Sequence, residues 1–188
     1  MIKLFLIAFI LLQLSCVEST SCGSSYPPLS SSSMMSPTTI NPDIEAATNF
    51  TVDISGNVES VYAYVLTANP QANPFVGKIW SSVDPSAPIC QSSPLSYSGP
   101  GWLTLPLSGC SVLPGQTYYA SVNYQSTERP YDATFFSNYP PPIISGDLTI
   151  DGASYSLTPG SFPSSTFRTS YYFIGVNFVI LLSPFLLQ

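Results

Sequence analysis

The stretch from Gly101 to Tyr124 constrains the fold most, because its apolar side chains recur with a period of two in two successive runs. One face of each run is apolar, and these faces hold Leu103, Leu105 and Leu107, then Tyr118, Ala120, Val122 and Tyr124. Turn-forming serine, glycine and proline separate the runs, so we expect two paired strands. A two-stranded ribbon is unstable alone in water, and a second layer must cover its apolar face. The sequence therefore predicts an all-β fold, an antiparallel β-sandwich.

Further strands are expected on both sides of this stretch, where the same alternation is interrupted by Gly, Pro and Asn. The run Val58–Leu66 is apolar on both faces, which is typical of a strand in the middle of a sandwich. We expect Leu148–Ile150 and Tyr155–Leu157 to form a short hairpin around an Asp-Gly turn. The other expected strands are Phe50–Ile54, Phe75–Trp80, Ile89–Gln91 and Tyr131–Phe136. Trp80 and Trp102 lie inside strands, so both are expected in the core.

The charge of the chain excludes one class of partner. Only 7% of the 188 residues are charged and the net charge is −6. Beyond the first few positions the basic residues are Lys78, Arg129 and Arg168, which leaves no basic patch for phosphate groups. Nucleic acid is therefore not expected as a partner, and hydroxyl and amide groups should cover the surface of a single domain.

The N-terminal region has the layout of a secretory signal peptide, with one lysine, an apolar run and then small residues. We expect residues 1–19 to be this signal and the mature chain to be extracellular. The alternative is a bacterial lipoprotein signal, with Cys16 as the lipidated residue. Residues 20–45 are rich in Ser, Pro and Thr and are expected to form a flexible leader. Asn49 begins a sequon for N-glycosylation and is expected at the edge of a strand.

Three cysteines remain after such a signal is removed: Cys22, Cys90 and Cys110. Two of them are expected to pair in an oxidising compartment. A bond between Cys90 and Cys110 would close a loop of about twenty residues and contribute about 3 kcal/mol. Cys22 is then left over, and it stays open whether it is free, pairs between chains or competes for one of the others.

The C-terminal residues Tyr171–Gln188 carry no charge and allow two interpretations. Hydropathy suggests a membrane helix or the removable signal of a lipid anchor. However, Tyr172, Ile174, Val176 and Phe178 alternate as a closing β-strand would place them. We expect the strand, which gives a sandwich over 46–180 and an apolar tail at 181–188. An anchor would instead require cleavage before the strand.

Catalytic chemistry has few candidates because the chain contains no histidine. A serine hydrolase would need an unusual base, and Lys78 is the one lysine beyond the N-terminal region. The nearest carboxylate pairs that could serve a glycosidase are Asp147 with Asp151 and Glu128 with Asp132, and the first of these pairs could also offer oxygens to calcium. Both pairs fit polar turns better, so we expect no catalytic residues, no metal site and no cofactor.

Aromatic side chains offer the one binding hypothesis that the residues support. Rings exposed beside hydroxyls and amides can stack on the apolar faces of sugars. The candidate ligand-binding residues are Tyr97, Tyr119, Tyr131 and Tyr139.

Several segments of the chain, taken together and in order, resemble the domain-of-unknown-function family 4082, which occurs in secreted and surface proteins. The segments are Asn57–Val58 with Val61–Tyr62, Val76–Ser82, Gly101–Trp102, Leu113–Val122, Tyr131–Phe136, Ser145–Thr149 and Phe162–Phe178. The resemblance implies a sandwich of the immunoglobulin or fibronectin type III style, in which the last segment is the closing strand. It implies no catalytic residues. The chain departs from the family pattern at Ile174–Gly175 and in having Cys90 and Cys110.

We therefore expect a non-catalytic, secreted or cell-surface module that recognises a glycan or an extracellular protein. The alternative is a structural component of an extracellular coat or matrix, and a domain resembling the accessory part of a hydrolase is more remote. A membrane is expected as a partner only if the C-terminal segment is an anchor signal.

Overall fold

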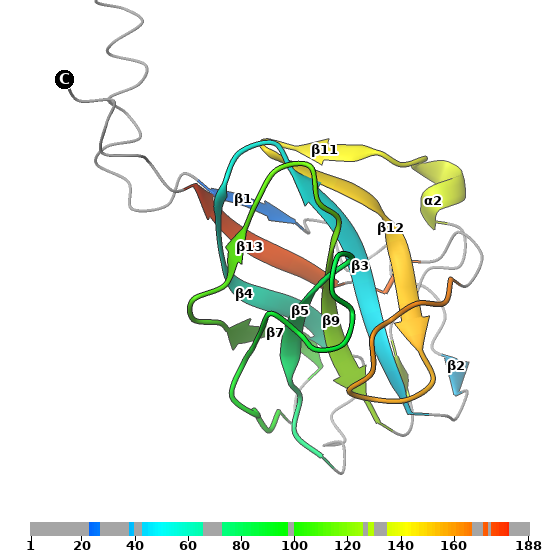
Figure 1. Cartoon of the computed structure of the whole chain (residues 1–188). Helices are drawn as coiled ribbons and strands as arrows, with labels where there is room; N and C mark the ends of the chain where they lie inside the picture. Colours follow the sequence, from blue (N-terminus) through cyan, green and yellow to red (C-terminus); the bar gives the residue numbers. More distant parts are fainter. Residues whose placement is uncertain are drawn as a thin grey trace, which may run out of the picture.

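The computed structural model of the protein describes residues 23–26, 38–39, 43–65, 73–97, 100–125, 128–129, 135–166, 171–172 and 174–180. Two antiparallel sheets pack face to face around one apolar core (Figure 1). The expected all-β sandwich is thereby confirmed. The immunoglobulin or fibronectin style stays a prediction. The expected signal at 1–19, the tail at 181–188, Tyr131 and Cys22 lie outside the described residues.

The smaller sheet is centred on β4 (Gly56–Val65), which pairs with β13 (Ile174–Ile180) on one side and with β7 (Gly101–Pro106) on the other. The edge strand β1 (Gly23–Tyr26) pairs with β13, and β8 (Ser111–Val112) pairs with the start of β4. The central place of β4 agrees with the apolar character of both its faces.

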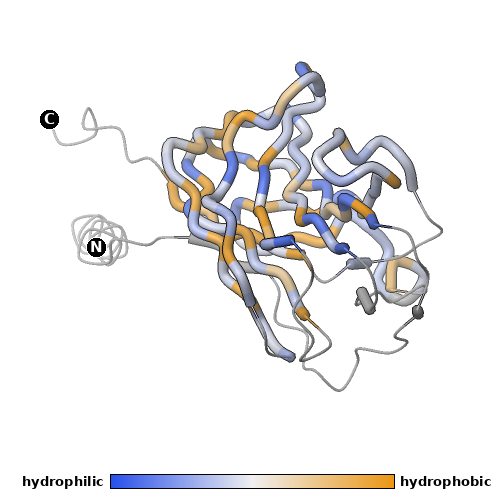
Figure 2. Tube along the Cα trace, turned by 90° about the horizontal axis from the view of Figure 1, so that it is seen from below, coloured by the Kyte–Doolittle hydropathy of each residue, from blue (hydrophilic) through white to orange (hydrophobic). Residues whose placement is uncertain are grey.

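The larger sheet has the strand order β11, β12, β3, β9, β5, β6. Its strands are β11 (Ile143–Ser145), β12 (Leu148–Ser156), β3 (Ile44–Val52), β9 (Tyr118–Tyr124), β5 (Gly77–Ser81) and β6 (Cys90–Gln91). The two-residue strands β2 (Thr38–Thr39) and β10 (Glu128–Arg129) pair separately. In Figure 2 apolar and polar positions alternate along the strands, as expected for sheets with one face on the core.

The expected pairing of the two strands between Gly101 and Tyr124 is wrong. β7 belongs to the smaller sheet and β9 to the larger one, so the turn between them carries the chain across the sandwich. Leu105 and Ala120 are both fully buried in the shared core, one from each sheet. Alternation shows that a strand has a buried face, but it does not show which strand lies beside it.

The expected hairpin around Asp151 is also wrong. β12 runs without a break from Leu148 to Ser156 and pairs with β3 along its length. The register shifts between Ile150 and Gly152, which makes Asp151 an extra residue in a β-bulge. The reversal lies earlier, between β11 and β12, where Gly146 has a φ of 61° that favours glycine. An Asp-Gly pair therefore marked a bulge here, and the Ser-Gly-Asp sequence before it marked the turn.

Phe135 and Phe136 belong to a short helix, α2 (Phe135–Asn138), and not to the strand expected at Tyr131–Phe136. The four residues before the helix lie outside the described residues. Both rings are buried, and that of Phe135 stacks on Tyr171 with centroids 4.8 Å apart. Two adjacent buried rings suit a helical turn at the end of the core, whereas a strand would send them to opposite faces.

The C-terminal segment forms the expected strand. Ile174, Val176 and Phe178 in β13 are buried in the core, and β13 lies between β1 and β4. The Thr48 hydroxyl of the opposite sheet donates to the Ile174 carbonyl at 2.6 Å, which ties the two layers together. None of the helices in the described residues is long and apolar enough to cross a bilayer.

The structure also changes the N-terminal boundary. β3 begins at Ile44, and both Ile44 and Glu45 are buried although the sequence placed them in the leader. Two short pieces of that leader, β1 and β2, lie in strands. Backbone pairing needs no apolar alternation, which explains why a Ser-rich segment gave no strand signal.

Cys90 and Cys110 form a disulfide with a Cα–Cα distance of 5.5 Å, as expected. Cys90 belongs to β6 at the edge of the larger sheet, and Cys110 precedes β8 of the smaller sheet. The bond therefore joins the two layers at one side of the sandwich.

Candidate functional site

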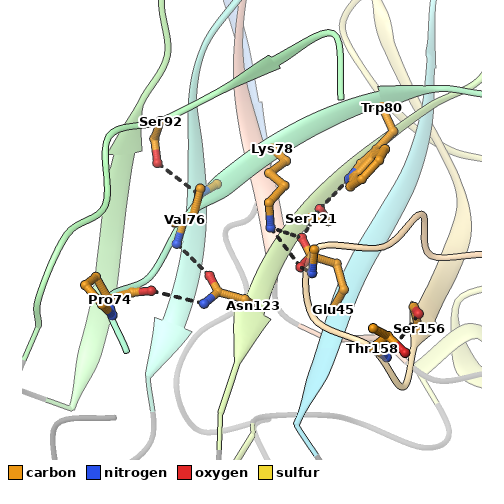
Figure 3. A network of polar contacts seen from close by, with 12 residues as sticks. Glu45, Pro74, Val76, Lys78, Trp80, Ser92, Ser121, Asn123, Ser156 and Thr158 are labelled. Atoms are coloured by element: carbon orange, nitrogen blue, oxygen red, sulfur yellow. Dashed lines mark hydrogen bonds and ion pairs between the residues drawn. The ribbon is translucent and has the colours of Figure 1, made fainter. Parts of the chain in front are cut away.

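The outer face of the larger sheet carries a buried polar network (Figure 3). The Lys78 ammonium on β5 donates to both carboxylate oxygens of Glu45 on β3, at 2.8 Å each. The Ser121 hydroxyl donates to Glu45 Oε1 at 2.6 Å and accepts from the Trp80 indole at 2.8 Å. The Gly160 N–H donates to Glu45 Oε2 at 2.8 Å. Glu45 is thus held by an ammonium, a hydroxyl and a backbone N–H.

This network stabilises the fold and does not present a serine nucleophile. Ser121 and Glu45 are fully buried, and the Ser121 proton is directed at the carboxylate and not at the lysine. A buried charge needs an opposite charge and hydrogen bonds to offset its loss of hydration, and Lys78 with Glu45 provides that. Sequence reasoning considered Lys78 only as a base and missed its partner, because Glu45 lies 33 residues earlier within the expected leader.

A loop over residues 157–165 covers this network. It leaves β12 and returns to pair Ser165 with Tyr155 through two backbone hydrogen bonds. Figure 1 shows this orange segment crossing in front of β3. The Phe162 ring makes edge-on contacts with Trp80 and Tyr119, at centroid distances of 5.9 and 4.8 Å. The part of the outer face of the larger sheet around Glu45 and Trp80 is therefore covered by the chain itself.

The outer face of the smaller sheet is aromatic, and in the described part of the chain Trp102, Thr104 and Pro106 on β7 are exposed, whereas Ser60 and Gly175 are buried. We call it the aromatic face, and it comprises the outward residues Ser60, Tyr62, Tyr64, Trp102, Thr104, Pro106, Gly175 and Asn177. Trp102 is 36% exposed, and its ring meets that of Tyr64 edge-on at 5.3 Å. Tyr62 and Tyr64 are half-buried, and Thr104 beside them is exposed.

Trp102 is therefore not the core residue that we expected. Leu103 and Leu105 point into the core, so a strand with a period of two must send Trp102 and Thr104 outward. The alternation in the sequence already contained this signal. The preference of tryptophan for the interior was the wrong guide here.

A polar group lies at the far end of the aromatic face. The Asn177 amide donates to Glu59 Oε2 at 3.2 Å, and Glu59 is exposed. Asn177 is opposite Ser60 in the register, and Gly175 is opposite Tyr62. Gly175 has no side chain and is buried beside Tyr62. The face thus runs from rings at Trp102 to amide and carboxylate groups at Asn177.

The tyrosines predicted to bind a ligand lie in separate parts of the molecule. Tyr97 is half-buried and packs on the core, with its hydroxyl beside the Gly101 backbone at the start of β7. Tyr119 lies under Phe162 on the larger sheet. Tyr139 is exposed after α2, with its ring 5.2 Å from Phe135. Of these tyrosines, Tyr97 is the one closest in sequence to the aromatic face, because it precedes Trp102 by five residues.

The carboxylates considered for catalysis or calcium lie at a turn and a bulge. Asp147 lies in the turn between β11 and β12, and Asp151 is the bulged residue. Burial raises the pKa of Asp151, and a hydrogen bond from Thr51 offsets part of that effect. Asp132 lies outside the described residues, and of Glu128 only the backbone is described. Within the described part of the chain, three or more metal-binding side chains do not gather anywhere.

Asn49 lies in the middle of β3 and not at the edge of a strand. It has β12 on one side and β9 on the other, and its side-chain oxygen accepts a hydrogen bond from Ser154 at 2.8 Å. Its glycosylation stays a prediction.

Comparison with known proteins places the chain in a family. The model of a family described as Domain of unknown function (DUF4082) matches residues 35–174. The chain belongs to this family. The match covers both sheets except for β1 and most of β13, and it confirms the resemblance drawn from the sequence segments. A comparison with curated proteins finds no match.

Proposed function

We propose that this protein is a non-catalytic glycan-binding module, and that the aromatic face is its binding surface. The observation that carries the proposal is the exposure of Trp102 beside Tyr64 on the outer face of the smaller sheet. Placing a large ring in water costs free energy that a ligand recovers when it covers the ring. An exposed tryptophan on a flat face thus indicates a surface that a partner occupies.

The chemistry of the face favours a sugar. The C–H groups on one side of a pyranose ring pack on an aromatic ring, while its hydroxyls need donors and acceptors. Trp102, Tyr64 and Tyr62 provide rings, and Thr104 and Asn177 provide a hydroxyl and an amide on the same face. A face of this kind suits a ligand that is apolar on one side and polar at its rim.

The proposed place of action is outside the cell or on its surface. The signal-like N-terminus supports this proposal, as does the Cys90–Cys110 disulfide, since disulfides persist mainly in oxidising compartments.

Protein recognition is a second candidate, and a different part of the molecule favours it. Exposed apolar side chains lie in or beside the loops at one end of the sandwich: Ile54, Val83, Leu113 and Ile144. These loops are joined in two pairs, because Asp53 N–H donates to the Asp147 carbonyl and Ser82 N–H to the Thr117 carbonyl, at 3.0 Å each. A coat or matrix role would use the same surface for self-association.

The test is retention of the protein on immobilised polysaccharides, with variants at matched aromatic positions. Trp102→Ala should abolish retention, and Trp102→Phe should keep part of it. Tyr139→Ala is the control, because Tyr139 is exposed and lies away from the aromatic face. If Tyr139→Ala weakens retention as much as Trp102→Ala does, or if no polysaccharide retains the parent, the proposal is wrong. Concentration-dependent self-association that Leu113→Asp abolishes would instead favour the coat role.

A further inference from the structure

We infer that the aromatic face binds an extended, uncharged oligosaccharide that lies along β4 and occupies three successive rows of side chains. The inference rests on the function proposed above and specifies its ligand. It follows from the register of the strands, from the change in chemistry along the face and from the position of the charges.

The register divides the face into three rows that run across the strands. The first row holds Tyr64 and Trp102, the second Gly175, Tyr62 and Thr104, and the third Asn177, Ser60 and Pro106. Side chains on one face of a strand recur every second residue, which sets the rows about 7 Å apart. Tyr64 and Ser60 are therefore separated by about 14 Å along β4. A single sugar ring is similar in size to one tyrosine ring, so it can occupy only one row.

The chemistry changes from row to row in a way that suits a chain of sugars. The first two rows offer rings for stacking, whereas the third offers the Asn177 amide and the Glu59 carboxylate that it contacts. A ligand that reaches the third row gains hydrogen bonds to its hydroxyls, and these bonds depend on hydroxyl orientation. We assign affinity to Trp102, Tyr64 and Tyr62, and specificity to Asn177 with Glu59.

The charges favour a neutral sugar. Glu59 is exposed at the third row, where it would repel a carboxylate or sulfate. Lys78 is the basic residue whose side chain the structure describes, and it is buried beneath the 157–165 loop on the other sheet. The described part of the chain therefore provides no cation at this face to neutralise an acidic sugar.

The direction along β4 follows from what borders the face. Across the strands it is narrow, because β7 is an edge strand of the described sheet and Gly175 on β13 has no side chain. Along β4 the three rows follow one another at every second residue, with Tyr64 and Tyr62 half-buried and Ser60 buried. A chain laid along the strand contacts every row, whereas a chain laid across it contacts one.

The inference is tested by calorimetric titration with neutral oligosaccharides of glucose, mannose and N-acetylglucosamine from one to five rings, and with oligogalacturonate as the acidic probe. For the sugar that binds, affinity should rise about fivefold for each added ring up to three, because each new row adds a contact, and should then level off. Asn177→Ala should lower affinity for the trisaccharide several-fold and leave the disaccharide unchanged. Oligogalacturonate should bind at least tenfold more weakly, and Glu59→Gln should reduce that difference.

Two results would overturn the inference while the proposed function survives. One is Trp102-dependent binding in which a single sugar competes as well as the trisaccharide. The other is oligogalacturonate that binds as tightly as the neutral chain. Absence of any Trp102-dependent binding to these probes or to immobilised polysaccharides would instead remove the proposed function itself, together with the inference that rests on it.

Discussion

The outer faces of the two sheets differ in how far their tryptophan side chains are exposed. On the larger sheet the 157–165 loop covers the buried Glu45–Lys78 pair, and Trp80 is 2% exposed beneath Phe162. On the smaller sheet Trp102 is 36% exposed, and its ring contacts that of Tyr64 edge-on. Both tryptophans point outward from their strands, so the difference between them lies in what covers them.

This comparison shows that burial of an outward residue is decided by a distant segment. Trp80 is buried as expected, but it packs under a loop and does not belong to the cluster between the sheets. Where a loop of the same chain covers part of a face, that part is not accessible to a ligand. A face that keeps a tryptophan exposed is available to a ligand, which is why the aromatic face carries the functional proposal.

The largest difference between the two faces is expected when each tryptophan is replaced by alanine. Trp80→Ala should lower the free energy of unfolding by about 3–5 kcal/mol, because it removes a buried ring. Trp102→Ala should cost about 1 kcal/mol, chiefly the contact with Tyr64. Urea unfolding followed by circular dichroism measures both. Equal losses of unfolding free energy in the two variants would show that Trp102 is as well packed as Trp80, and the two faces would then not differ in this respect.

Breaking the ion pair tests whether the closed face depends on its charges. Glu45→Gln leaves Lys78 buried without an opposite charge and should cost about 3 kcal/mol. The double variant Glu45→Gln/Lys78→Met should recover most of this loss, because no unpaired charge remains. The same unfolding assay measures the coupling. A double variant no more stable than the single one would mean that the hydrogen bonds to Ser121 and Gly160 matter more than the charge.

Opening the cover tests the role of the loop. Phe162→Ala removes the ring that packs on Trp80 and Tyr119 and should cost about 2 kcal/mol, since the ring is only partly buried. Trp80 should then become accessible, which a fluorescence quencher such as acrylamide would detect. Leu157→Ala is the control, because Leu157 is in the same loop but exposed. Equal quenching in Phe162→Ala and the parent would show that the loop covers Trp80 without that ring.

The smallest effect concerns Asp151, at the other end of the larger sheet. Burial raises its pKa in the folded protein, so the folded state binds the proton more tightly than the unfolded state. Stability is therefore lost as the pH rises from the ordinary value of 3.8 through the raised value. Asp151→Asn should add no more than about 0.5 kcal/mol at neutral pH, because the site is largely solvated. Melting temperatures at pH 3 and pH 7 test this, and a gain of equal size at both would exclude the carboxylate as its cause.

Much of the candidate site was present in the sequence as a local pattern. Leu103 and Leu105 fix the inner face of β7, and that alone makes Trp102 and Thr104 outward. The wrong expectation for Trp102 came from setting residue type above alternation. The bulge at Asp151 and the helix at Phe135 could not be found in the same way, because both depend on the strands and rings against which they pack.

By itself the sequence determined that most of the chain forms strands and which alternate residues of a strand such as β7 face the core, and it favoured a closing strand at the C-terminus and a bond between Cys90 and Cys110. These properties follow from short-range alternation and composition. Only the tertiary structure decided that β7 and β9 lie in different sheets, that Glu45 meets Lys78 and Gly160, and that a loop covers Trp80 on one outer face while Trp102 stays exposed on the other. The reason is sequence distance, since Glu45 and Gly160 are 115 positions apart and no local pattern encodes their contact.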